Sequence, residues 1–218
     1  MTSRSLPALD RARIDEAVAA ERRRLADFVA VLPDDQWATP SQCAAWTVRD
    51  VVAHLTVTTR VSVPRVLHAA VRARGDFDRV AVDLAAERAA AHAPAELVAQ
   101  LRDSAASTRR IIGSGPMDPL MDLVIHGQDI ARPLGRRYVS PPEVVRACLA
   151  YVATNRFMGG PRRLEGVRLV SSDTGWTLGD GADLRGSDVD LLLVAAGRRA
   201  GLDALDGPGK PMMAERLS

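Results

Sequence analysis

Two histidines and an aspartate are the residues whose types and spacing could do chemistry in this chain. His54 lies in the stretch S-Q-C-A-A-W-T-V-R-D-V-V-A-H-L, and His126 lies in M-D-L-V-I-H-G-Q-D-I-A-R-P-L-G, where Asp122 precedes it by four residues. Residues four apart on a helix are separated by about 40° around its axis, so Asp122 and His126 would point the same way. We therefore predict that His54, Asp122 and His126 bind one divalent metal between two neighbouring helices.

The type of metal site follows from the number of ligands. Three protein ligands leave one coordination position open, which suits catalysis better than a closed structural site. Imidazole and carboxylate fit Zn²⁺, and they also fit Ni²⁺, Co²⁺ or Fe²⁺. Asp129 and Gln128 lie close after His126, and we expect either of them to orient a ligand or a bound water. Arg60 and Arg132 are candidates for holding an anionic carboxylate of a substrate or cofactor, with a solvated helix face as the alternative for each.

The composition limits the class of protein. A chain of 218 residues with 47% hydrophobic content can bury a sizeable core. Its net charge of +2 is mixed along the sequence, so nucleic acid is not an expected partner. The first ten residues lack the apolar segment of a signal peptide, and no apolar run is long enough to span a bilayer. We therefore expect a cytoplasmic protein that does not associate with membranes.

The two cysteines are far apart and lack C-x-x-C spacing. They are typical of reduced thiols rather than of a disulfide framework. Cys43 precedes the proposed site closely, but we expect it to be a small buried hydrophobe. There is also no G-x-G-x-x-G after a predicted strand, no P-loop, no H-E-x-x-H and no G-x-S-x-G. Nucleotide cofactors and serine hydrolysis therefore lack support.

Hydrophobic periodicity predicts a mainly α fold, with a helix bundle over residues 8–138 and a small α+β module over residues 141–218. Thr47 and Asp50 have the spacing of a capping box, which should begin the helix that carries His54. The helices expected in the bundle are 11–32, 47–74 with a kink at Pro64, 80–92, 94–112 and 118–132. The module should contain helices 143–158 and 187–199 and three short strands at 167–170, 176–178 and 183–185.

At these residues the chain resembles the mycothiol-dependent maleylpyruvate isomerase family, which belongs to the wider DinB-like metalloenzyme bundles. W-T-V-R-D-V-V-A-H-L, after a Pro-Ser-x-Cys loop, is similar to the N-terminal signature of that family. H-G-Q-D-I-A-R-P-L-G is similar to the fourth-helix signature of its actinobacterial members, and D-T-G-W-T-L-G-D-G begins a run similar to its fused C-terminal domain. The resemblance implies a DinB-like four-helix bundle with one divalent metal, usually zinc, on His54, Asp122 and His126. The isomerase itself has Glu at the position of Asp122 and His at the position of Gly127.

The resemblance also implies a function. The open metal position would bind a thiol, and the resulting thiolate would add to a small electrophilic substrate in an isomerisation or an S-transfer. The arginine-rich composition fits a GC-rich actinobacterial genome, where mycothiol is the abundant thiol. The expected partners are this small thiol and the electrophile, and the protein is expected to be a monomer or homodimer. Two alternatives stay open: a metal-dependent hydrolase with an activated water, and a non-catalytic metal-binding or regulatory protein.

Overall fold

The computed structural model describes residues 9–111 and 113–218. Most of the N-terminal segment considered for a signal peptide, and Ile112 at the end of one predicted helix, lie outside the described residues. Contacts divide the chain into one unit of Arg11–Tyr138 and a second unit that contains Val139–Ser218. Within the described ranges, no helix combines the length and the apolar character needed to cross a membrane.

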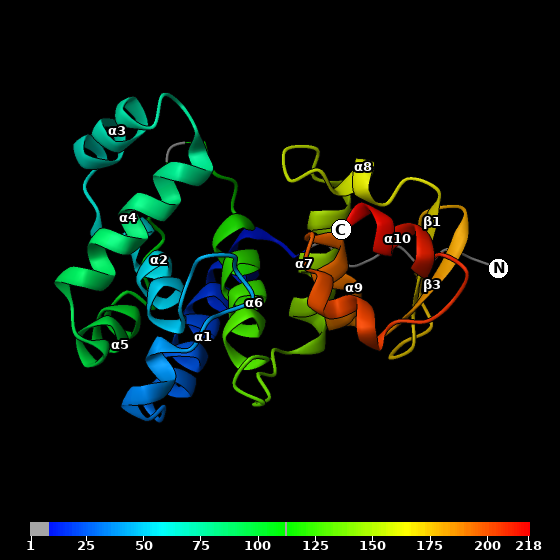
Figure 1. The fold of residues 1–218 in the computed structure, drawn as a ribbon, viewed down its shortest axis with the longest axis horizontal. Helices are drawn as coiled ribbons and strands as arrows, with labels where there is room; N and C mark the ends of the chain where they lie inside the picture. The colour runs from blue at the N-terminus through cyan, green and yellow to red at the C-terminus, as the bar shows by residue number, and fades with distance from the viewer. Residues whose placement is uncertain (1–8, 112) are drawn as a thin grey trace. The chain divides into compact units, whose positions relative to one another are not determined.

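The first unit is a four-helix bundle, as predicted. Helices α1 and α2 each pack against both α5 and α6, and α4 packs along α2 and carries α3 (Figure 1). The largest fully buried side chains of the bundle are leucines and one isoleucine, and they come from α1, α5 and α6. The elements of this unit are α1 (Arg11–Ala30), η1 (Asp34–Ala38), α2 (Val48–Arg60), α3 (Val63–Arg72), α4 (Phe77–Ala91), α5 (Pro94–Asp103) and α6 (Asp118–Ala131).

The start of α2 is set by local chemistry. The Thr47 hydroxyl accepts a hydrogen bond from the Asp50 backbone N–H, and the Asp50 carboxylate accepts one from the Thr47 backbone N–H. These two bonds satisfy backbone donors that the first helical turn leaves without partners. The predicted capping box is therefore confirmed, and it fixes where the helix bearing His54 begins.

The prediction of one helix over residues 47–74 is wrong. Helix α2 ends at Arg60, Val61 is extended, and α3 starts at Val63 with Pro64 in its first turn. In a continuous helix, the ring of Pro64 would clash with the carbonyl of the residue four positions earlier, which is Arg60. Pro64 therefore separates two helices instead of kinking one.

The predicted helix over residues 94–112 is also shorter than expected, because α5 ends at Asp103. The chain beyond it is held by Arg22 of α1, which is only 3% exposed. The Arg22 guanidinium donates hydrogen bonds to the carbonyls of Ser104, at 2.7 Å, and of Ser107, at 2.6 Å. A buried cation thus supplies donors to these carbonyls, and the Ser107 N–H also donates to the Ser104 carbonyl at 2.9 Å.

The second unit is a small α+β module, as predicted. Its sheet has the order β2-β1-β3, in which β1 pairs antiparallel with β2 and parallel with β3. Helices α7 and α9 pack against each other. The tail, which shows little pattern in the sequence, contains a further helix, α10. The elements are α7 (Pro142–Thr154), α8 (Gly160–Arg163), β1 (Val167–Ser171), β2 (Thr177–Leu178), β3 (Ala182–Gly186), α9 (Asp188–Ala195), η2 (Arg199–Ala204) and α10 (Lys210–Arg216).

Candidate functional site

Two helices of the bundle bring the two predicted histidines together. His54 lies on α2 and His126 on α6, and their ring centroids are 5.1 Å apart in an edge-to-face arrangement. The indole of Trp46, in the segment just before α2, lies 4.9 Å from the His54 ring and 6.1 Å from the His126 ring. Two imidazoles and one aromatic wall therefore share one small region of the bundle.

A carboxylate and a thiol surround one nitrogen of His126. The Nδ1 atom lies 3.0 Å from the Asp129 carboxylate and 3.6 Å from the Cys43 sulfur. The Cys43 thiol in turn donates a hydrogen bond to the same Asp129 oxygen, at 3.1 Å. Asp129 is 1% exposed and His126 is 7% exposed, so these electrostatic interactions are screened little by water.

The loop before α2 is tied to α6 through its backbone. The Gln42 N–H donates to the Asp129 carbonyl at 3.0 Å. The loop is closed on itself by a bridge between Pro40 and Thr47 and by a bond from the Ser41 N–H to the Trp46 carbonyl. These bonds explain how a cysteine distant in sequence reaches His126.

The surroundings of His126 change its pKa. Burial alone lowers the pKa of this imidazole, but the hydrogen bonds and charges of Asp129 and Cys43 outweigh burial and raise the pKa to about 10. In the metal-free protein, His126 is thus an imidazolium that is paired with a buried carboxylate. A metal bound by this ring would have to displace a proton.

This raised pKa predicts a pH-dependent stability of the metal-free protein. A histidine with a folded pKa of about 10 and an ordinary value of 6.5 stabilises the fold fully below about pH 6.5 and loses that contribution as the pH rises through about 10. The native chain should therefore exceed Asp129→Asn in free energy of unfolding most at pH 6.5, and this difference should shrink towards pH 10. Urea unfolding in the presence of a chelator measures it, and a difference that stays constant across this range would contradict the prediction.

The other predicted residues lie in different settings. Asp122 is half-buried on α6, one turn before His126. The Gln128 amide donates to the Tyr138 carbonyl at 2.8 Å, and its oxygen accepts a bond from the Arg132 guanidinium at 3.4 Å. Arg60 instead faces α5, where it contacts the Gln100 carbonyl at 3.2 Å and the carboxylate of Asp103 at 3.4 Å.

The structure thus brings His54, His126 and Asp129 together, and it holds Gln128 and Arg60 in contacts with other parts of the bundle. The Gln128 amide joins the end of α6 to the segment that follows it. Arg132 is half-buried one turn beyond Gln128.

Gly127 has a packing reason to be glycine. A Cβ atom at this position would lie 2.3 Å from Cε1 of Tyr138, far inside van der Waals contact. The Tyr138 ring is held in place, because its hydroxyl donates to the fully buried carboxylate of Glu21 at 2.8 Å. The tyrosine ring therefore occupies the space that a side chain at position 127 would need.

The side chains around His126 fit a divalent metal. Cys43, His126 and Asp129 each offer one ligand atom, and these atoms all lie within 4.8 Å of one another. The hydrogen bonds described for His126 use Nδ1, so Nε2 can also serve as a ligand. Nitrogen, oxygen and sulfur donors of this kind bind Zn²⁺ and neighbouring transition metals.

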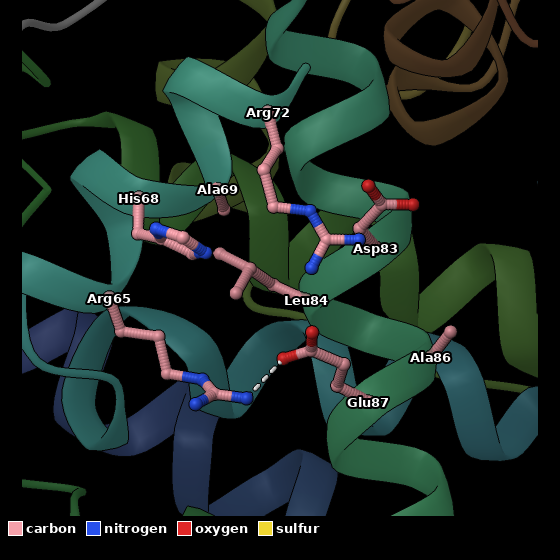
Figure 2. Close-up of a pocket in the computed structure, with 8 residues that line it drawn as sticks. All are labelled: Arg65, His68, Ala69, Arg72, Asp83, Leu84, Ala86 and Glu87. Atoms are coloured by element: carbon pink, nitrogen blue, oxygen red, sulfur yellow. Dashed lines mark hydrogen bonds and ion pairs between the residues drawn. The ribbon is translucent and has the colours of Figure 1, made fainter.

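A separate groove of about 380 Å³ lies between α3 and α4 and contains none of the predicted site residues. Figure 2 shows Arg65, His68 and Arg72 on the α3 side, facing Asp83 and Glu87 on α4. Arg65 and Glu87 form an exposed ion pair at 2.7 Å, which contributes little energy in water. His68 is exposed and belongs to this solvated groove.

Two residues of the site, Cys43 and Trp46, were not predicted from the sequence. The expectation that Cys43 is a small buried hydrophobe is wrong, because its side chain is half-buried and its sulfur contacts Asp129 and His126. Trp46, which is not among the predicted site residues, lies against both imidazoles. Their position just before the helix of His54 is the signal that could have indicated them.

Comparisons with known proteins agree with this architecture. Residues 18–119 match the family model described as the mycothiol maleylpyruvate isomerase N-terminal domain, and no curated protein matches the chain. The crystal structure of the mycothiol-dependent maleylpyruvate isomerase is similar with a TM-score of 0.60 at 15% identity, over 93% of this chain and 94% of that chain. A histidine-to-alanine variant of that isomerase gives 0.58 at 12% identity over the same shares. At these identities the likeness shows the fold, which confirms the predicted fold class.

Proposed function

We propose that this chain is a metal-dependent and mycothiol-dependent enzyme, because residues 18–119 match the family model described as the mycothiol maleylpyruvate isomerase N-terminal domain. Its substrate is a small electrophile, which it isomerises or to which it transfers the thiol. The observation that carries this proposal is the convergence of His54 and His126, whose rings lie 5.1 Å apart on separate helices. A bundle that served only as a scaffold would have no need to gather two imidazoles, a carboxylate and a thiol.

The ligands in this proposal are His54, Asp122 and His126, with zinc as the metal and nickel, cobalt or iron as alternatives. Asp129 has the role of fixing the tautomer of His126. Its carboxylate lies 3.0 Å from Nδ1, so the proton of a neutral imidazole stays on Nδ1 and the Nε2 lone pair is available to the metal. A bound divalent metal lowers the pKa of a coordinating thiol, so that a thiolate is available at neutral pH.

Other residues position the substrate and exclude water. Trp46 covers one side of both imidazoles and restricts the space beside them. Arg132 is half-buried near the end of α6, where its guanidinium can hold a carboxylate of the substrate or of mycothiol. The Arg60 guanidinium contacts Gln100 and Asp103 of α5, so the proposed site does not include it. The departures at Asp122 and Gly127 leave the identity of the electrophile open, so maleylpyruvate is one member of a panel.

The test combines metal analysis with turnover. We expect metal in protein purified without chelator, and turnover of one or more electrophiles only when mycothiol is added. His54→Ala should lower that turnover at least about 100-fold, since loss of a ligand exceeds the 10–100-fold effect of an outer partner. His92→Ala is the matched control, because His92 ends α4 and its ring lies near Gln100 and Glu96. Metal-dependent turnover without any thiol would instead support a hydrolase, and absence of metal would support a non-catalytic protein.

A further inference from the structure

Cys43 adds a donor that the proposed ligand set does not use. Its sulfur lies 3.6 Å from Nδ1 of His126 and 3.1 Å from the Asp129 carboxylate, on the nitrogen that the proposed site leaves to Asp129. We propose that Cys43, His126 and Asp129 form a second, thiolate-containing set of metal ligands, which binds a thiophilic divalent cation such as Zn²⁺ or Co²⁺. This set shares only His126 with the set of the proposed function.

The distances support coordination. Metal–ligand bonds of about 2.0–2.3 Å at tetrahedral angles separate donor atoms by about 3.3–3.8 Å. The sulfur-to-Nδ1 distance of 3.6 Å already lies in that range. The distances from Asp129 to Nδ1, at 3.0 Å, and to the sulfur, at 3.1 Å, are hydrogen-bond lengths, and each needs to widen by only a few tenths of an ångström. Replacing the shared protons by one cation requires no larger movement.

The backbone holds the three donors in place before any ion binds. His126 and Asp129 lie one turn apart on α6, and the Gln42 N–H binds the Asp129 carbonyl at 3.0 Å. The Cys43 N–H donates to the Ser41 hydroxyl at 3.1 Å, and this hydroxyl donates to the Trp46 carbonyl at 2.9 Å. Because the loop is bonded both to α6 and within itself, little conformational entropy is lost when an ion binds.

The chemistry of the set selects its cation. A thiolate is a soft ligand, so a set with one sulfur, one nitrogen and one oxygen favours Zn²⁺ or Co²⁺ over Mg²⁺ and Ca²⁺. His126 and Asp129 are buried, whereas Cys43 is half-buried. Three protein donors leave a fourth position for water or a small thiol.

Cobalt absorption tests this set directly. Co²⁺ added to the metal-free protein should produce a near-ultraviolet band from thiolate-to-cobalt charge transfer, together with visible bands of a low-coordinate site. Cys43→Ser should abolish the charge-transfer band and weaken Co²⁺ binding at least about 10-fold. Cys148→Ser is the matched control, because Cys148 is the other cysteine of the chain and is buried in α7, and it should keep the band.

Further variants separate this inference from the proposed function. His54→Ala should keep the charge-transfer band, since His54 belongs to the other set. Wild-type protein that binds Co²⁺ without the band, and that loses binding in His54→Ala, would overturn the inference and leave the proposed function intact. A band that persists in Cys43→Ser would also overturn it. Absence of Co²⁺ binding in the wild type would count against both.

Discussion

Replacement of His126 by alanine is expected to remove metal binding and thiol-dependent turnover together. His126 is the residue common to both ligand sets, and its ring lies between His54 and the pair Asp129 and Cys43. Loss of a direct ligand should reduce metal affinity by more than the about 10–100-fold effect of an outer partner. Metal content per chain and turnover with mycothiol measure the two effects.

The same substitution should also lower the stability of the metal-free protein. Asp129 is 1% exposed, and loss of its imidazolium partner takes a charge-assisted hydrogen bond from a buried carboxylate, at a cost of about 1–3 kcal/mol. His68→Ala is a suitable control, because His68 is exposed in the groove between α3 and α4. A His126→Ala variant with native metal content would show that the ion lies elsewhere.

Replacement of Gly127 by alanine is expected to destabilise the bundle by about 1–3 kcal/mol, as overpacking of a well-filled core does. The added Cβ would lie 2.3 Å from a ring carbon of Tyr138, which cannot easily move because its hydroxyl is bonded to buried Glu21. Helix propensity acts in the opposite direction, since alanine favours a helix over glycine by about 1 kcal/mol. The steric effect should dominate, and urea unfolding measures the difference.

A double variant separates these two effects. Tyr138→Ala removes the ring, so Gly127→Ala introduced into that background should be neutral or stabilising. Gly127→His, which introduces a larger side chain, should be more destabilising than Gly127→Ala in the native background. If Gly127→Ala stabilised the native chain by the full propensity difference, the close approach to Tyr138 would be refuted.

Local signals in the sequence predicted much of the fold. The periodicity of α1, the capping box at Thr47 and Asp50, and the three short strands depend on patterns among neighbouring residues, and these predictions are confirmed. Several helices end earlier than predicted, and the differences are largest for α2 and α5. Pro64 contained the necessary local information, whereas the end of α5 depends on Arg22, which lies 82 residues from its partner Ser104. No local pattern reveals such a partner.

The candidate site could be predicted only in part, because some of its contacts also depend on residues distant in sequence. The positions of His54 and His126 follow from their helices, and the bundle brings the two rings together. The approach of Cys43 depends on how a loop without regular structure is tied to α6 by the Gln42 N–H. Gln128 is close to His126 in sequence, yet its amide binds the Tyr138 carbonyl, because adjacent residues on a helix face different directions.

The close approach of Tyr138 to α6 has a consequence for the evolution of this bundle. Positions 127 and 138 compete for the same volume, so they are expected to change together. Relatives with a side chain next to the second histidine should have a smaller residue, or a displaced segment, in place of the tyrosine. Relatives with glycine there are free to keep the aromatic ring and its bond to the acidic residue of the first helix.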